Sequence, residues 1–551
     1  MLLIKKSYKI KGLFSNIFFQ IILYVHSLEI QIKRVKTMNS DKTSFSNAHP
    51  TLWIRESKGK ILSGKTIVLG VTGSIAAVQT IQLARELIRY GASVHAVATD
   101  AALHIIHEEA LHYATGNPVI TALTGRVEHV EFFGASGRAD LFLIAPATAN
   151  TISKIAAGID DTPVTTFATT AIGENKKIMI VPAMHESMYR HPKVLENLAI
   201  LKSWGIDIVG PRIEEGIAKI ADIDEIVLRV LRTLGGHSLA GTSVFVTSGA
   251  TAEAIDPIRI LTNRASGKTG DAIAREAYIR GAEVYLFHRT VSKYHRLPDF
   301  HDVFTESCSD MIHAVTEKVA LANPPKFGKN ILISAAAISD YTLDAAGSKI
   351  KSGDSDLILK FRPTKKLIEE ACYTDPDLFI VGFKAEADVL FEELIDLAVA
   401  KIEDGVVDMV VANDVREKGM GTDDNDVYLV TPMYLKTRNS ADIVSISGSK
   451  EKIAVKLLDY ILVEMSRIAA ETVVFSEPPQ GFTDSILISN DDTGVGFGTA
   501  DEIETKADFV LDSKSETVSS SYLPSDSPSQ PKRPLRKKTM RVSGFKKRNE
   551  S

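Results

Sequence analysis

Residues 243–270 form a strand, a polar loop and the start of a helix, and they contain the most distinctive candidate chemistry of this chain. The apolar run 244–246 is typical of a buried strand, and Ser-Gly-Ala-Thr (248–251) follows it. A long polar loop leads to Ser-Gly-Lys-Thr-Gly (266–270), where a helical pattern begins. Glycines and backbone N–H groups at a helix N-terminus can hold phosphates. The spacing is neither G-x-G-x-x-G nor Walker A, so it does not predict an ordinary dinucleotide or P-loop site.

In the first half of the chain, polar and small residues follow the ends of several apolar strands. Gly73 and Ser74 come directly after the run 65–71 and open a helical segment. This arrangement suits a single phosphate, and it also describes an ordinary helix N-cap. Residues 146–151 offer small side chains and hydroxyls where a flat ring could lie close to the backbone, and 182–189 form a polar and aromatic loop.

His129 stands in the sequence Glu-His-Val-Glu, ahead of a helical stretch. An imidazole between two carboxylates could move a proton near neutral pH. A lone histidine, however, is usually a surface or packing residue. The loops that are expected at the same sheet edge favour the catalytic interpretation.

Strand and helix patterns alternate through both halves, which a short linker within 234–241 separates. The predicted strands are 65–71, 93–99, 141–145, 178–181 and 206–209 in the first half, and 243–247, 283–287, 330–335, 378–382 and 407–411 in the second. Nearly continuous apolar strands indicate parallel sheets that are covered on both faces. We therefore expect an α/β fold with two doubly wound, Rossmann-like domains whose sites lie at the carboxyl ends of the strands.

The composition is that of a soluble globular protein, with 44% apolar and 24% charged residues in 551. A net charge of −5 gives no reason to expect nucleic acid as a partner. The two cysteines, Cys308 and Cys372, permit neither a disulfide framework nor a cysteine zinc site. These features favour a protein of the reducing cytoplasm.

We expect two folded domains, at 61–235 and 240–468, between two segments outside the fold. Residues 1–60 form an N-terminal extension, and 470–551 form a disordered tail that is first acidic and then basic. The apolar stretch 12–28 resembles a signal anchor, but polar residues interrupt it and it is short for a membrane span. We therefore expect the natural start at Met38, with a membrane anchor as the alternative.

Two sets of motifs resemble two known enzyme families. The first set is similar to the flavin-dependent phosphopantothenoylcysteine decarboxylases and comprises residues 71–77, His129, 145–150, 158–161 and 182–189. The second is similar to phosphopantothenate–cysteine ligase and comprises residues 256–259, 263–268, 335–340, 349–351, 382–386 and 412–414. Together they span about 62–465, in the order of the fused bifunctional enzymes of coenzyme A synthesis.

The ligase resemblance implies that a nucleoside triphosphate, CTP in the microbial fused enzymes, activates the carboxylate of 4'-phosphopantothenate before cysteine attacks it. It implies that Asn263 polarises the acyl intermediate and that Arg259 holds the phosphopantothenate. Lys349 is implied as a catalytic residue against the nucleotide phosphates. The implied nucleotide-binding residues are Ala335, Ala336, Asp340, Lys349, Phe383 and Lys401, among which Asp340 is the candidate for Mg²⁺ or ribose and Phe383 for base stacking.

The decarboxylase resemblance implies FMN, which serves as an electron sink while carbon dioxide leaves. His129 takes the position of the family's essential histidine. The implied cofactor-binding residues are Gly73, Ser74, Thr99, Pro146, Thr148, Asn150, Met184 and His185. Gly73 and Ser74 suit one terminal phosphate, and the first half has no second glycine-rich loop for a pyrophosphate, which favours FMN over FAD.

Two positions depart from the familiar decarboxylase pattern, as in archaeal-like versions of the family. His185 stands where the family has asparagine, and the region 215–221 lacks the cysteine that returns a proton to the product. Lys219 is the candidate to replace that cysteine, provided that a mobile segment around 212–222 closes and desolvation makes its ammonium a better acid. The alternative is that Lys219 pairs with the substrate or with solvent.

Two other functions are compatible with parts of the sequence. One is a flavin decarboxylase or prenyltransferase relative fused to an unrelated nucleotide-binding domain, against which Arg259, Asn263 and Lys349 argue. The other is a flavoprotein regulatory subunit with an acidic tail, against which His129 and the ligase motifs argue. The resemblance also implies a homo-oligomer, with trimers of the decarboxylase half, dimers of the ligase half and a dodecamer as one combination. We expect no stable membrane association.

Overall fold

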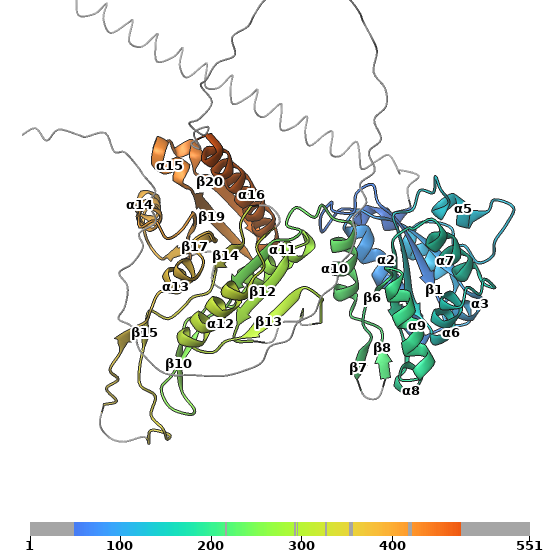
Figure 1. The fold of residues 1–551 in the computed structure, drawn as a ribbon, viewed down its shortest axis with the longest axis horizontal. Coiled ribbons are helices and arrows are strands. Elements are labelled where there is room, and N and C mark those ends of the chain that lie inside the picture. Colours follow the sequence, from blue (N-terminus) through green and yellow to red (C-terminus); the bar gives the residue numbers. More distant parts are fainter. Residues whose placement is uncertain are drawn as a thin grey trace, which may run out of the picture.

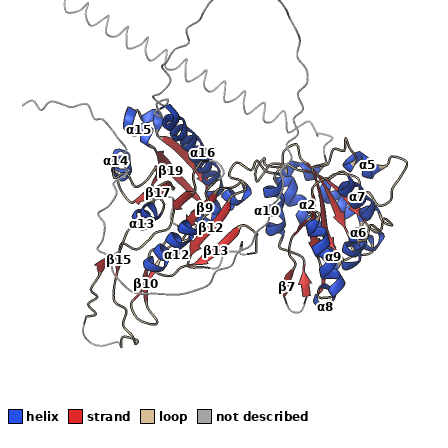
Figure 2. Cartoon of the chain, in the orientation of Figure 1, coloured by secondary structure: helices blue, strands red, loops and turns tan. Residues whose placement is uncertain are grey.

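Two open sheets, each covered by helices, carry the described part of the chain (Figure 1). The computed structural model describes residues 49–214, 217–290, 294, 296–325, 328–351, 356–416 and 421–474. Helices lie on both faces of each sheet (Figure 2), as expected where strands are apolar along their whole length. The predicted α/β class with two parallel-sheet units is therefore confirmed.

The first unit is built on a five-stranded parallel sheet in the order β2-β1-β3-β4-β6. Its strands are β1 (Thr66–Val71), β2 (Ser93–Ala98), β3 (Leu141–Ala147), β4 (Ile178–Pro182) and β6 (Asp207–Ile208). The helices around it are η1 (Pro50–Ile54), η2 (Ile75–Gln79), α2 (Thr80–Arg89), α3 (Asp100–Leu103), α4 (Glu108–Thr115), α5 (Glu128–Phe133), α6 (Ala149–Ala156), α7 (Pro163–Gly173), α8 (Glu186–Tyr189), α9 (Pro192–Ser203) and α10 (Ile223–Leu234). All five strands match the predicted apolar runs.

The second unit is built on an eight-stranded sheet in the order β13-β12-β9-β14-β17-β18-β19-β20, in which β19 runs antiparallel to both of its neighbours. Its strands are β9 (Ser243–Thr247), β12 (Glu283–His288), β13 (Phe300–Phe304), β14 (Ile331–Ser334), β17 (Phe379–Glu386), β18 (Met409–Asp414), β19 (Asp424–Val430) and β20 (Val444–Ser449). Its helices are α11 (Lys268–Ile279), α12 (Cys308–Leu321), α13 (Leu367–Thr374), α14 (Phe391–Glu403), α15 (Pro432–Thr437), η3 (Ser440–Asp442) and α16 (Lys450–Val474). The sequence predicted five of these strands but not β13, β19 or β20.

Three small sheets extend the loops of the two units. In the first unit, β5 (Met184–His185), β8 (Ile217–Lys219) and β7 (Arg212–Glu214) form an antiparallel sheet with β8 in the middle. In the second unit, β10 (Ala252–Ala254) pairs with β11 (Ile260–Thr262), and β15 (Tyr341–Thr342) pairs with β16 (Arg362–Pro363). These short strands and the loops between them include Met184, His185, Lys219, Arg259 and Lys349.

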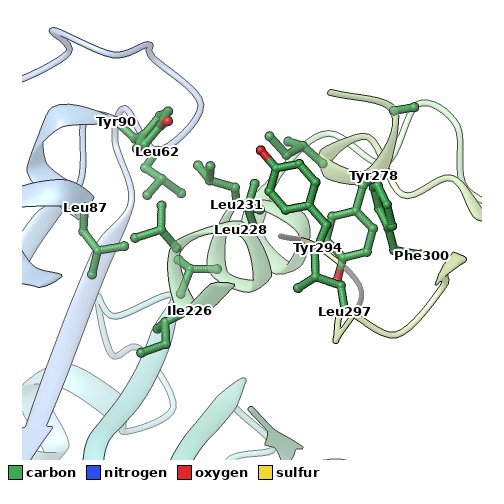
Figure 3. Close-up of a cluster of buried hydrophobic side chains, with 14 of the residues drawn as sticks. Leu62, Leu87, Tyr90, Ile226, Leu228, Leu231, Tyr278, Tyr294, Leu297 and Phe300 are labelled. Atoms are coloured by element: carbon green, nitrogen blue, oxygen red, sulfur yellow. The ribbon is translucent and has the colours of Figure 1, made fainter. Parts of the chain in front are cut away.

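Helix α10 connects the two units and packs between them (Figures 1 and 3). Its side chains Leu228 and Leu231 belong to one buried apolar cluster that includes Leu87 of α2 and Tyr278 of α11. Arg229 of the same helix binds Asp207 in the first unit and reaches the Tyr278 hydroxyl, at 3.5 Å, in the second. The two units therefore share a continuous core.

Among the helices that the structure describes, none combines the length and the apolar character that crossing a membrane requires. The expectations for the apolar stretch 12–28 and the start at Met38 concern positions outside the described residues. Of the predicted tail 470–551, the structure describes only 470–474, which form the last turn of α16.

Candidate active sites

The loops after β1 and β3 are tied together at the carboxyl edge of the first sheet. The hydroxyl of Thr72, which is buried, donates to the backbone oxygen of Pro146 at 2.7 Å and accepts from the backbone N–H of Thr148 at 3.0 Å. Gly73 and Ser74 follow Thr72 directly. The structure thus brings the predicted phosphate-binding turn and the predicted ring-binding loop together.

Three short helices begin at this edge, each after a side-chain cap. Ser74 accepts from the N–H of Ala76 at the start of η2, Thr99 from Ala102 at the start of α3, and Thr148 from Thr151 at the start of α6. The N-cap interpretation of Ser74 is therefore correct. The remaining free N–H groups of a helix start also favour an anion, so the cap does not exclude a phosphate beside it. Asn150 lies exposed in the first turn of α6.

Gly73 is required by a close approach of two loops. A Cβ atom added to Gly73 would lie 2.7 Å from the Cβ of Ala101 in α3, well inside contact distance. The turn after β1 can therefore meet the start of α3 only because residue 73 has no side chain. Thr99, at the end of β2, is buried at the same place.

His129 lies in α5 beside the ring of Phe167, with a centroid separation of 6.5 Å. Its Nδ1 atom is buried and has no hydrogen-bond partner among the described residues. The preceding residue, Glu128, is buried, and its carboxylate accepts hydrogen bonds from the hydroxyl and the backbone N–H of Thr124. These hydrogen bonds lower the pKa of the Glu128 carboxyl. A buried ring nitrogen without a partner is costly, and a bound molecule could supply the missing hydrogen bond.

The hairpin of β7 and β8 pairs with β5, a short strand in the loop that follows β4. Met184, which is buried, pairs with Ala218, and the exposed His185 pairs with Ile217. Lys219 is the next residue of β8, and its Nζ lies 3.4 Å from a carboxylate oxygen of Glu214. Two predicted site residues, His185 and Lys219, therefore belong to one small sheet. Both cysteines lie in the second unit, in α12 and α13.

In the second unit, hydrogen bonds join the loops after β9, β11 and β14. The Thr247 hydroxyl accepts from the N–H of Ala336 at 3.2 Å, and the Thr251 hydroxyl accepts from the N–H of Ser339 at 2.9 Å. The side-chain amide of Asn263 donates to the backbone oxygen of Ala337 at 3.1 Å. Asn263 thus lies against the predicted nucleotide-binding segment, which begins at Ala335.

A buried carboxylate organises the neighbouring loop. Asp256 accepts hydrogen bonds from the N–H groups of Ile258, Arg259 and Ile350. Burial acts to raise the pKa of Asp256, but these bonds and the nearby Arg259 outweigh it and the pKa is lowered. Arg259 lies 3.3 Å from Asp256 and donates to the backbone oxygen of Ile350 at 3.0 Å. Lys349 is exposed beside this junction, so the structure brings Arg259 and Lys349 to one place.

Lys401 lies close to Lys366, Lys384 and Asp340 near the carboxyl ends of β14 and β17, and Lys384 forms an ion pair with Glu386. Lys401 of α14 donates to the backbone oxygen of Phe383 at 3.3 Å. Burial first, and then the charges of Lys384 and Lys366, lower the pKa of Lys401. Lys366 forms an ion pair with Asp340. Such a set of cations suits the phosphates of a nucleotide.

The sequence named Lys401 but missed Lys366 and Lys384. Lys384 was within reach of sequence reasoning, because it stands directly after Phe383 in the ligase motif. Lys366 lies in a plain Thr-Lys-Lys run, and only the fold brings it to Asp340. Among the described residues, no group of three or more His, Cys, Asp or Glu side chains could hold a metal ion, so Asp340 belongs to no such group.

The start of α11, with Gly267, Lys268 and Gly270, makes contacts with Ser248 and Asp423. Ser248 donates to the backbone oxygen of Gly267 at 2.8 Å and to Asp271 at 2.9 Å. Lys268 extends to Asp423, with its Nζ 2.5 Å from a carboxylate oxygen. Gly267 has a φ of +83°, the left-handed region that favours glycine.

Comparisons with known proteins follow the same division of the chain. Residues 55–235 match the family model "Flavoprotein", and residues 239–465 match "DNA/pantothenate metabolism flavoprotein C-terminal domain". The coenzyme A biosynthesis bifunctional protein CoaBC of Thermococcus kodakarensis is 50% identical over 394 residues, which cover 70% of this chain and 94% of that protein. The CoaBC protein of Methanocaldococcus jannaschii is 36% identical over 419 residues, covering 75% and 97%. The solved DNA/pantothenate metabolism flavoprotein of Streptococcus pneumoniae is 25% identical, covers 40% of this chain and 99% of its own, and has a TM-score of 0.34.

Proposed function

Because the chain belongs to the family of CoaBC bifunctional coenzyme A biosynthesis proteins, we propose that its first unit works with FMN and its second unit with CTP and Mg²⁺. The chain is a bifunctional enzyme, with phosphopantothenoylcysteine decarboxylase and phosphopantothenate–cysteine ligase activities. The functional domains are 61–235 and 240–468. Its working environment is the cytoplasm, and its assembly combines trimers of the first unit with dimers of the second.

The ligase step begins when the carboxylate of 4'-phosphopantothenate attacks the α-phosphate of CTP and pyrophosphate leaves. Lys349, Lys366 and Lys401 carry charges that neutralise the phosphates. The cysteine amine then attacks the acyl carbon, and CMP leaves. Asn263, whose amide is held on the Ala337 backbone oxygen, donates to the oxygen on which negative charge develops, while Arg259 holds the phosphopantothenate.

Other groups of the second unit complete the nucleotide site. Ala335 and Ala336 supply backbone groups after β14, and Phe383 stacks on the base. Asp340 holds Mg²⁺ or the ribose, in exchange for its ion pair with Lys366. The metal neutralises phosphate charge when it is bound.

The residues of the first unit fit a flavin with one terminal phosphate. Capped helix starts at Ser74, Thr99 and Thr148 present N–H groups at one edge, and the Thr72 hydroxyl fixes the loop of Pro146 beside them. FMN, when bound there, supplies the chemistry that oxidises the cysteinyl thiol, lets carbon dioxide leave and returns the hydride. Asn150, Met184 and His185 border the ring.

Two side chains act on the substrate in this unit. His129 offers its buried, unpartnered Nδ1 to the substrate and orients it or moves a proton. Lys219 either returns a proton to the product or binds the substrate's charged groups. The single observation that supports the proposal is that loops from each motif set are joined at the carboxyl edge of their own sheet, through Thr72 in the first unit and Asn263 in the second.

The test is to incubate the purified protein with FMN, phosphopantothenate, cysteine, CTP and Mg²⁺ and to determine the masses of the products. We expect 4'-phosphopantetheine, carbon dioxide and CMP, and released flavin that is mainly FMN. If phosphopantothenoylcysteine were the end product, the chain would have ligase activity but no decarboxylase activity. No product at all, or FAD as the main flavin, would overturn the corresponding part of the proposal.

A further inference from the structure

The second unit contacts the hairpin of β7 and β8 in the first unit. The segment before β13 runs back toward the first unit, and its residues Tyr294 and Leu297 are buried in the core that both units share (Figure 3). Between these two anchors lies Arg296, whose side chain is 38% exposed. Its guanidinium lies 3.8 Å from a carboxylate oxygen of Glu214, at the end of β7.

Glu214 is the point at which three basic side chains meet. Besides Arg296, it contacts Arg212 of its own strand and Lys219 of the neighbouring strand, each at 3.4 Å. Arg212 is fixed in turn by Asp222 at 2.9 Å and by the backbone oxygen of Ile220 at 3.1 Å. Because Lys219 contacts Glu214 directly, a shift of Glu214 would also move the Lys219 side chain.

A hollow lies beside Arg212 and Arg296. Arg212, Glu225 and Arg296 line a cavity of about 530 Å³ between the two units. Burial raises the pKa of Glu225 although Arg296 acts in the opposite direction. In this region the units meet through charged side chains, so the hairpin depends on charge for its position against the second unit.

We infer that Arg296 of the ligase unit is a positioning residue for decarboxylation, because through Glu214 it holds the β7–β8 hairpin and Lys219 against the β5 loop of Met184 and His185. Arg296 touches no reacting atom. The inference rests on the proposed role of the hairpin at the decarboxylase site. It makes the ligase unit a structural part of that site.

The experiment measures decarboxylation of supplied phosphopantothenoylcysteine by the full chain, with kcat and KM determined separately. Arg296→Gln should lower kcat/KM about two- to fivefold, the range expected when a partly exposed ion pair is removed. Arg296→Lys should restore most of the loss, and the difference should shrink in about 1 M salt, where the Debye length is about 3 Å. Ligation should be unchanged.

A double-mutant cycle and a matched control separate positioning from general damage. Once Glu214→Gln is present, adding Arg296→Gln should cost nothing further, because the pair is already broken. The control is Arg275→Gln, which removes a 2.8 Å hydrogen bond to the Tyr90 hydroxyl elsewhere in the same interface and should leave decarboxylation unchanged. Wild-type kinetics in Arg296→Gln, additive losses in the double variant, or an equal loss in Arg275→Gln would each overturn the inference. A wild-type chain that fails to decarboxylate would instead refute the proposed function.

Discussion

The Nδ1 atom of His129 is, among the described residues of the first unit, a buried polar side-chain atom without a hydrogen-bond partner. Asparagine keeps a polar group of similar reach but cannot exchange a proton near neutral pH. His129→Asn should therefore abolish carbon dioxide release, while phosphopantothenoylcysteine accumulates because ligation continues. Mass analysis of the products after incubation with all substrates measures both outcomes.

Asn263→Asp is the reciprocal control, because this substitution replaces a donor by a carboxylate in the other unit. It should slow ligation about 10²–10³-fold, as expected for the loss of one oxyanion donor, with the acyl-cytidylate detectable. Decarboxylation of supplied phosphopantothenoylcysteine should remain. If either substitution removed both activities in folded protein, the two sites would not be independent.

Lys219 can act as a proton donor or as a binding residue, and Lys219→Met distinguishes the two roles. If Lys219 donates the proton, the variant should still release carbon dioxide but accumulate the aminoenethiol, with the flavin absorbance bleached. If Lys219 binds substrate, the normal product should form with a raised KM. Product masses and the flavin spectrum, recorded over one turnover, decide between them. Unchanged kinetics and product would contradict both roles.

At the scale of elements, the turn after β1 depends on the absence of a side chain at residue 73. Gly73→Ala would place a Cβ 2.7 Å from the Cβ of Ala101, with the backbone of Ala101 only 3.1 Å away. Because backbone cannot yield as a flexible side chain does, we expect a loss of about 1–3 kcal/mol of stability and weaker flavin retention. Flavin content after gel filtration, with thermal unfolding alongside, measures the effect.

Gly173→Ala, at the end of α7, is the matched control, because a Cβ there meets nothing within 4 Å. It should retain the flavin. Full flavin retention in Gly73→Ala would show that the approach of α3 to this turn does not shape the cofactor site.

A strand could be predicted from the sequence where its own residues form an apolar run, and could not where only its tertiary contacts define it. The strands β1, β3, β4 and β9 are nearly continuous apolar runs, and β2 is apolar apart from Ser93 and His95, so the sequence alone identified all five. Strand β19 alternates buried and partly exposed residues, and β20 has a single buried residue, so neither resembles a continuous core strand in the sequence. The strands β5, β7 and β8 have two or three residues each, and only tertiary contacts define them.

The same distinction applies to the candidate sites. Gly73, Asn263 and Arg259 stand in recognisable motifs, and the fold places them at sheet edges where loops meet. Lys366, the N-cap residue of α13, stands in no motif, and only the fold brings it to Asp340. Arg296 acts from the other unit, and no pattern along the chain links residues 296 and 214.

At the scale of the whole molecule, the shared core makes the two units mutually dependent. Leu231 of α10 is fully buried between them, beside Tyr278 of α11 (Figure 3). In two domains joined only by a linker, a cavity in one would leave the other unaffected. Here the cluster includes side chains of both units, so damage at the junction should reach both.

Leu231→Ala should therefore destabilise both units by about 2–5 kcal/mol, the cost of a buried leucine truncated to alanine. Amide hydrogen exchange in β1 reports on the first unit and exchange in β12 on the second, and both should accelerate. Leu321→Ala is the matched control, because Leu321 is 70% exposed at the end of α12, and its effect should stay within about 0.5 kcal/mol. Faster exchange in β1 alone would mean that the second unit is stable without the junction, and the contact of Arg296 with Glu214 would then connect two independently folded bodies.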